Sequence, residues 1–183
     1  MTTPMRIYTL SADANRYQNI IAASGSGWDR FRDFDGRRLG EQWGIPQVRA
    51  LIDEEQNKNL PVGDFPALAS HIPVFTPRAA DALRPLISPF GEFLNLNMEG
   101  QELYAFNVTK LVDGLDRTNS VYQTFPDGKR IMIIEKHVFI PSAIEGLPIF
   151  KLAPLPLMYV YVSHTFVECV KRNDLKGFWF RPV

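Results

Sequence analysis

The chain has little cysteine and no excess of charge, and each scarcity excludes a class of protein. Its single cysteine, Cys169, cannot form a disulfide within the chain, so we exclude a disulfide-stapled scaffold and expect a reducing compartment. Twenty basic residues balance twenty acidic ones, and the halves 1–90 and 91–183 hold ten of each kind. Because nucleic-acid binding needs a basic surface that displaces counterions from phosphates, the overall charge does not favour such a partner.

Long apolar runs are also missing. The stretch 155–162 is far shorter than the roughly 20 apolar residues that a membrane-spanning helix needs. Residues 1–6 lack the apolar core of a signal peptide. Hydrophobic residues still make up 45% of the chain, which is enough for a sizeable core. We therefore expect a folded cytoplasmic protein with no membrane partner.

Signatures of catalysis are absent as well. The histidines, His71, His137 and His164, show no metal-ligand spacing with one another or with Cys169. The glycine-rich segment 24–27 lacks the lysine and the Ser or Thr that a phosphate-binding loop requires. The sequence therefore predicts no catalytic residue, no metal and no cofactor.

What is present is an irregular order of strands and helices. Apolar and β-branched residues predict strands at 6–10, 103–108, 131–140, 158–162 and 178–180. Apolar spacing predicts a short helix at 48–52 and another from Ser163 to Arg172. A third helix is predicted to begin at Pro77, with Thr76 as its cap, and to end no later than Pro89. Residues 28–35 mix aromatics with charges and are expected to form a strand or loop. Because strands and helices do not alternate strictly, we predict an α+β fold, a mainly antiparallel sheet with a few helices packed on one side.

Two aspartates offer the only carboxylate pair worth testing for chemistry. Asp113 and Asp116 would share a face only on a helix, and Gly114 argues against a helix there. Local hydrogen bonds to backbone N–H groups are the favoured interpretation. The alternative is a small enzyme or ligand-binding domain, in which these aspartates meet His137 or His164 in a pocket.

Four C-terminal motifs carry the strongest signal. They are the strand 103–108 ending in Asn107-Val108, the stretch 115–120, the segment 147–152, and the helix after Ser163 followed by Gly177-Phe178-Trp179-Phe180. In this order they resemble the eleventh family of bacterial immunity proteins, which protect cells against polymorphic toxins. The resemblance covers about 60–183, whereas 1–59 fits only through an opening strand. The length of the chain fits one domain, 1–183, with an N-terminal portion, 1–59, and an immunity-like portion, 60–183.

Such a resemblance implies a non-catalytic inhibitor that binds and neutralises a cognate toxin domain by occluding it. Mixed charges among aromatics favour a protein interface at residues 28–38, since Trp and Arg are common binding anchors. A base-stacking strip for nucleic acid and a solvated edge with inward aromatics are the two alternatives there. The predicted partner-binding residues are Trp28, Arg30, Asp33, Asp35, Arg37, Arg38, Trp43, Asp53, Glu54 and Glu55.

Overall fold

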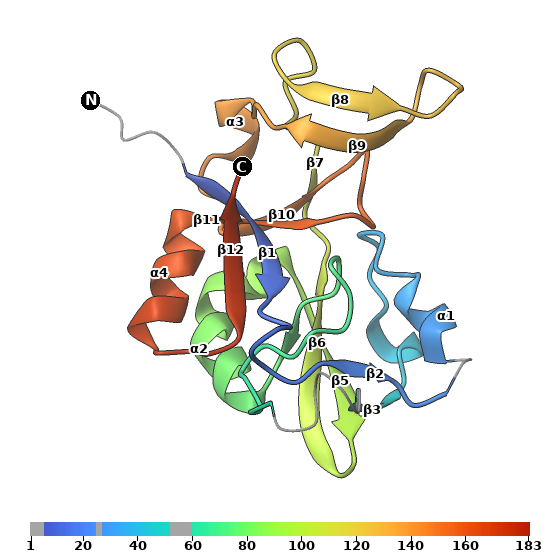
Figure 1. The fold of residues 1–183 in the computed structure, drawn as a ribbon, viewed down its shortest axis with the longest axis vertical. Coiled ribbons are helices and arrows are strands. Elements are labelled where there is room, and N and C mark those ends of the chain that lie inside the picture. Colours follow the sequence, from blue (N-terminus) through green and yellow to red (C-terminus); the bar gives the residue numbers. More distant parts are fainter. Residues whose placement is uncertain (1–5, 25–26, 52–59) are drawn as a thin grey trace.

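The computed structural model describes residues 6–24, 27–51 and 60–183 (Figure 1). Their strands form two five-stranded sheets and a separate two-stranded hairpin. The helices of this described part are α1 Gly27–Phe31, α2 Pro77–Ile87, α3 Pro141–Ile144 and α4 His164–Arg172, with 3-10 turns η1 Gly40–Gln42 and η2 Ser88–Phe90. The predicted α+β class is confirmed, although the strands form two main sheets rather than one.

The first sheet joins the two ends of the described chain. Its order is β12-β1-β11-β10-β7, with bounds Phe178–Pro182, Ile7–Ala12, Val160–Ser163, Ile149–Leu152 and Leu111–Val112. All neighbours are antiparallel except β7 and β10, which are parallel. β1 lies between β11 and β12, and Tyr8 is opposite both Val162 and Pro182. The N-terminal strand is therefore built into a sheet whose other strands come from the second half of the chain.

The second sheet is built around one long hairpin. Its order is β2-β3-β5-β6-β4, with bounds Ile20–Ala22, Gln47–Ala50, Gly91–Met98, Gln101–Val108 and Val74–Phe75. β5 and β6 pair along their whole length, from Gly91 opposite Val108 to Met98 opposite Gln101. Glu99 and Gly100 between them both have positive φ, 53° and 88°. Such a two-residue turn matches the twist of the strands it joins and fixes their register.

The remaining hairpin stands apart from both sheets. β8 Val121–Thr124 and β9 Ile131–Lys136 pair only with each other among the described strands, and they project at the top of Figure 1. A lone two-stranded hairpin is marginally stable in water. This one is anchored from one side, because Ile131 and Ile134 are buried in a core cluster with Phe150 and Tyr161.

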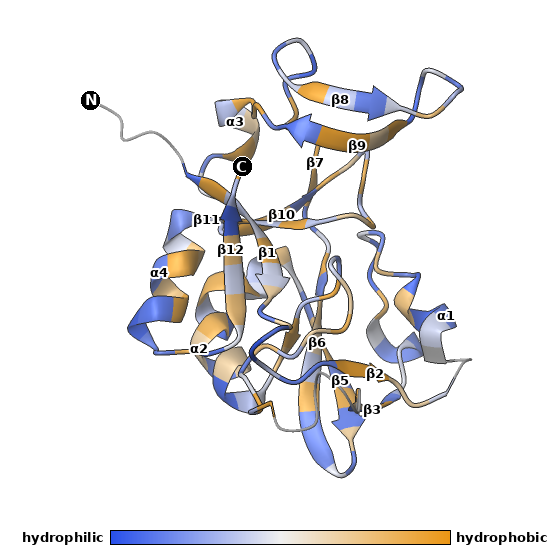
Figure 2. Cartoon of the chain, in the orientation of Figure 1, coloured by the Kyte–Doolittle hydropathy of each residue, from blue (hydrophilic) through white to orange (hydrophobic). Residues whose placement is uncertain are grey.

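The two longer helices pack against each other and against the main core cluster. Thr76 caps α2 by accepting a hydrogen bond from the N–H of Ala79 at 3.4 Å, and Pro77 follows as the first helical residue, as predicted. The predicted apolar face of α2, Ala79, Ala80, Leu83 and Ile87, is buried, and so is that of α4, Phe166, Val167 and Val170. Figure 2 shows these apolar positions alternating with hydrophilic ones along each helix. No helix in the described ranges is long and apolar enough to cross a bilayer.

Two predictions in the N-terminal half are wrong in whole or in part. Residues 28–35 were expected to form a strand or loop, and 32–35 do lie in a loop, but Gly27–Phe31 is a helix that brings the Trp28 and Phe31 rings to 5.7 Å. Residues 48–52 were expected to form a helix, but β3 runs over Gln47–Ala50, with Val48 buried between exposed neighbours. Pairing with β2 and β5 decides this segment, because ladder hydrogen bonds outweigh a weak helical spacing.

The predicted strand at 131–140 is too long. β9 ends at Lys136, and Phe139 forms only an isolated bridge with Leu115. Its partner β8 was not predicted, because a four-residue strand without a buried position shows no alternation of apolar and polar residues. The single-domain prediction for 1–183 stays a prediction.

Candidate partner-binding surface

The segment from the last residue of α1 to Trp43 turns its aromatic side chains inward. Phe31, Phe34 and Trp43 are buried and form an aromatic cluster, with ring centroids 5.4 to 6.3 Å apart. The indole N–H of Trp43 donates to the carbonyl oxygen of Asn95 at 2.8 Å. Trp43, predicted to contact a partner, therefore holds the segment to β5, whereas Trp28 keeps 37% of its surface exposed. The inward-facing interpretation of segment 28–38 therefore applies to Phe31 and Phe34, two of its three aromatics, but not to Trp28.

Residues 32–43, here called the clamped loop, contain no strand and only the short turn η1, yet their backbone is held by side chains of β5 and β6. Glu92 accepts hydrogen bonds from the N–H groups of Leu39 at 2.6 Å and Gly40 at 3.3 Å. The side-chain amide of Asn107 donates to Glu92 at 2.8 Å and to the carbonyl oxygen of Arg37 at 2.7 Å. Asn107 is fully buried, so these bonds are shielded from competing water.

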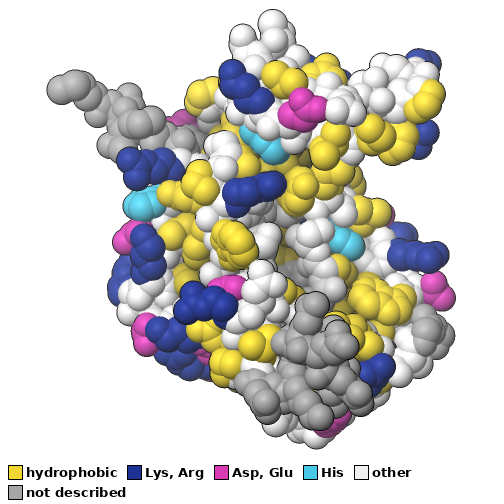
Figure 3. All heavy atoms as spheres, in the orientation of Figure 1, with side chains coloured by type: hydrophobic (Ala, Val, Ile, Leu, Met, Phe, Trp, Pro, Cys, Tyr) yellow, Lys and Arg dark blue, Asp and Glu magenta, His cyan; other side chains and the backbone are white. Residues whose placement is uncertain are grey.

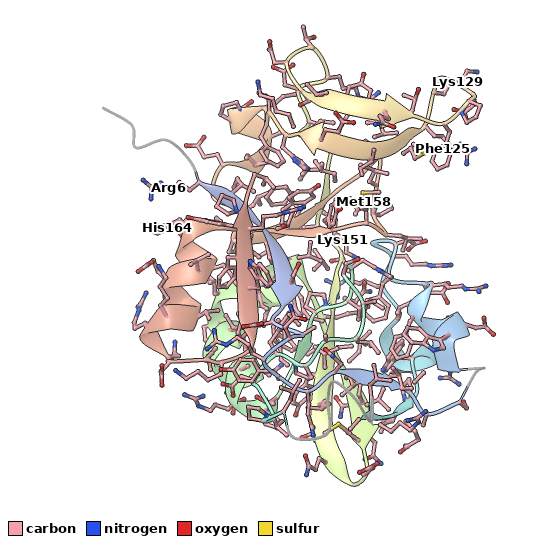
Figure 4. The ribbon with its side chains drawn as sticks, in the orientation of Figure 1. Arg6, Phe125, Lys129, Lys151, Met158 and His164 are labelled. Atoms are coloured by element: carbon pink, nitrogen blue, oxygen red, sulfur yellow. The ribbon has the colours of Figure 1, made fainter. Side chains whose placement is uncertain are left out.

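A third side chain reaches the same loop from the other sheet. Lys151 lies in β10, is fully buried, and its ammonium donates to the carbonyl oxygen of Phe34 at 2.5 Å. Burial lowers the pKa of Lys151 to about 8, and the nearby Asp35 carboxylate partly opposes that shift. Figure 4 shows Lys151 in the interior, where β10 approaches the loop. Glu92, Asn107 and Lys151 are called the loop clamp below.

The clamp leaves a set of charged side chains on the outside. Arg37 forms ion pairs with Asp33 and, at 3.3 Å, with Asp35. The Arg30 guanidinium donates to the carbonyl oxygen of Trp43, which ties α1 to the far end of the loop. Arg38 is exposed and forms no ion pair with any described residue. The predicted residues Asp53, Glu54 and Glu55 lie outside the described ranges.

A shallow apolar pocket lies beside α1. It has a volume of about 310 Å³ and is lined by Trp28, Phe31, Arg32, His71 and Leu157. Burial, together with the charge of Lys151, lowers the pKa of His71 and so disfavours its charged form. Trp28 and Leu157 are 37% and 47% exposed, so the pocket opens directly onto the surface next to the clamped loop.

The aspartates considered for catalysis are engaged locally. Asp116 accepts from the N–H groups of Thr118 and Asn119 and from the Asn119 side chain at 2.7 Å, and these bonds lower the pKa of Asp116. Asp113 is exposed and lies 3.8 Å from Arg117. The favoured interpretation, local backbone bonding, is thus what Asp116 does.

The two histidines proposed to join these aspartates have other partners. His137 lies 3.0 Å from the Tyr161 hydroxyl, and His164 lies 3.6 Å from Glu168. Within the described ranges no three His, Cys, Asp or Glu side chains gather as metal ligands would. The thiol of Cys169 donates to the carbonyl oxygen of Ala82 at 3.6 Å, which joins α4 to α2.

Sequence reasoning missed the clamp, although two of its members lie inside the motifs already described. Asn107 ends the strand motif, and Lys151 sits within the segment 147–152. Each is a polar residue in an otherwise apolar strand, and this pattern could have indicated them. Buried polar side chains need hydrogen-bond partners, so such a residue predicts a polar contact inside the fold.

Comparison with protein families decides what kind of protein carries this arrangement. The model of the immunity protein family Imm11 matches residues 92–183, just over half of the chain. The chain belongs to the Imm11 family. A comparison with curated proteins gave no match.

The residues matched by the Imm11 family model include the loop clamp but not the clamped loop. Glu92, Asn107 and Lys151 all lie within the matched residues, whereas α1 and the clamped loop precede them. The matched portion therefore supplies the side chains that hold the loop, and the unmatched portion supplies the loop itself. Membership in an immunity family points to a role in neutralising a toxin.

Proposed function

We propose that this Imm11 protein binds one toxin domain tightly and neutralises it by occlusion, without turnover, through α1 and the clamped loop. The observation that carries the proposal is the loop clamp. Three partly or fully buried polar side chains form hydrogen bonds with the backbone of a surface loop. A loop fixed before binding loses less conformational entropy when a partner docks, so its contacts contribute more of their energy to affinity.

The exposed side chains support the same proposal. Trp28 is an exposed aromatic of α1, and Arg37 and Arg38 are exposed arginines of the clamped loop that follows α1. Trp and Arg are among the residues that most often dominate binding energy at interfaces. Charged groups around such anchors speed the association of two proteins and select the partner. The proposed interface consists of Trp28, Arg30, Asp33, Asp35, Arg37 and Arg38, with Trp43 as an internal support.

The test is a titration of the purified toxin domain encoded beside this chain's gene. We expect inhibition to be complete at one chain per toxin molecule, with a 1:1 complex on a sizing column. Trp28→Ala and Arg38→Glu should weaken binding about 30-fold or more, as hot-spot residues do. The matched controls are Trp179→Ala and Arg172→Glu, which alter an exposed tryptophan and an exposed arginine on β12 and α4.

Two outcomes would contradict the proposal. A toxin domain that neither binds nor loses activity would remove the immunity function. Inactivation of many toxin molecules by one chain would show turnover and replace occlusion with catalysis.

A further inference from the structure

We propose that the pocket beside α1 receives a large apolar side chain from an acidic segment of the toxin. This inference rests on the proposed function and adds the chemistry of the partner's contact segment. The pocket walls come from three separate stretches, α1, the segment that carries His71, and the loop between β10 and β11 that carries Leu157. Such a site exists only in the folded protein.

The lining fits an apolar guest. Trp28, Phe31 and Leu157 supply apolar walls, and the Trp28 ring packs edge-on against Phe31 at 5.7 Å. His71 adds a ring whose pKa is lowered by burial and by Lys151, so a charged imidazolium is disfavoured in this lining. A volume of about 310 Å³ is at the lower end of the range for ligand pockets, and it accommodates one or two large side chains.

The charges around the pocket indicate an acidic partner. Arg32 lines the pocket, and its ion pair with Asp29 is 3.7 Å long with both side chains largely exposed. Exposed ion pairs of this kind contribute little, so Arg32 remains available to a carboxylate of the partner. α1 and the clamped loop together, residues 27–43, hold four arginines and four acidic residues, so the positive charge at the pocket itself is that of Arg32.

The hairpin β8–β9 adds positive charge on the other side of the pocket. Figure 3 shows an indentation at the right edge of the molecule, between the hairpin above and α1 below, with Lys or Arg side chains on both sides. Figure 4 places Phe125 and Lys129 at the outer end of the hairpin and Met158 in the loop below it. Segment 121–136 carries three basic residues against two acidic ones. An acidic segment that places an apolar side chain in the pocket would therefore meet positive charge on both sides.

The experiment compares matched substitutions in the full chain against the purified toxin domain encoded beside its gene. Leu157→Asp puts a carboxylate at the mouth of the pocket, whereas Ile140→Asp makes the same change at an exposed isoleucine just before α3. We expect Leu157→Asp to weaken binding about 30-fold or more and Ile140→Asp to leave it unchanged. Arg32→Glu should slow association and reduce its salt dependence, whereas Arg172→Glu should not.

A crosslink identifies the occupant directly. Leu157→p-benzoylphenylalanine, irradiated in the complex, should attach to a toxin peptide that contains Leu, Met, Phe or Trp next to Asp or Glu. Circular dichroism and urea unfolding of each variant confirm that it is folded before its binding is compared.

Each outcome has a separate meaning. If the wild-type chain binds the toxin and Leu157→Asp binds equally well, the pocket inference is overturned and the proposed function stands. If Leu157→Asp weakens binding but neither Arg32→Glu nor added salt slows association, the acidic character of the segment is overturned. If the wild-type chain does not bind the toxin, both proposals fall. A free chain that dimerises through Leu157 would assign the pocket to a second copy instead.

Discussion

The ammonium of Lys151 donates a hydrogen bond to the carbonyl oxygen of Phe34, although the two residues are 117 positions apart in the chain. Lys151 belongs to a buried strand of the family-matched portion, and Phe34 belongs to the loop outside it. Burying an ammonium costs free energy unless it is hydrogen-bonded. The contact therefore ties the position of a surface loop to the core of the Imm11 fold.

Replacing this lysine should loosen the loop more than it destabilises the protein. In Lys151→Met the carbonyl oxygen of Phe34 loses a charged donor, which costs about 1.5–3 kcal/mol, but the core no longer buries an ammonium. We expect a net change in the free energy of unfolding within about 2 kcal/mol. Amide exchange in residues 34–40 should accelerate and toxin affinity should fall about tenfold. Lys110→Met, at an exposed lysine, is the control; equal exchange rates in both variants would refute a clamping role.

Glu92 should contribute more to stability than other glutamates of its hairpin. Its carboxylate accepts from the N–H groups of Leu39 and Gly40 and from Asn107. Glu92→Ala leaves these donors without a partner, and we expect a loss of about 2–3 kcal/mol in urea unfolding. Glu102→Ala, at an exposed residue on the adjacent strand, should cost less than about 1 kcal/mol. Similar losses for both variants would show that the clamp contributes no special stability.

Acid should destabilise the protein through His137. Burial, with a smaller contribution from Arg181, lowers the pKa of His137 from 6.5 to about 4. Between those pH values the unfolded chain binds a proton that the folded chain does not, so the free energy of unfolding falls as pH drops from 6.5 toward 4. We expect His137→Gln, which keeps a hydrogen-bonding group for Tyr161, to flatten that dependence in urea titrations. An unchanged pH slope would show that His137 is not the group responsible.

Gly91 should tolerate no side chain. A Cβ there would lie 2.4 Å from the carbonyl oxygen of Asn107, a backbone atom that cannot move away without breaking the β5–β6 hairpin. We expect Gly91→Ala to cost about 3 kcal/mol, at the upper end for overpacking. Gly146→Ala is the control, because that glycine has positive φ but open space around it, and it should cost about 1 kcal/mol. Equal midpoints in urea would contradict the steric argument.

Some helices and strands can be predicted from the residues within them alone. The cap at Thr76, the proline at position 77 and the spacing of Ala79, Leu83 and Ile87 are enough to predict α2. The same holds for α4 and for the β-rich strands near the C-terminus, where the motifs of the family lie. These signals are short-range, so they can be recognised before the chain is folded.

Tertiary structure decided the rest. β3 is a strand because β2 and β5 lie on either side of it, and β9 ends where pairing with β8 ends. The loop clamp joins Arg37 to Asn107 and Phe34 to Lys151, across 70 and 117 positions of the chain. The partner of such a side chain cannot be predicted from a sequence pattern, because every residue carries a backbone carbonyl and nearly every residue carries a backbone N–H. The sequence by itself therefore determined the family and the helical faces, whereas only the fold determined which surface loop is bonded to the core.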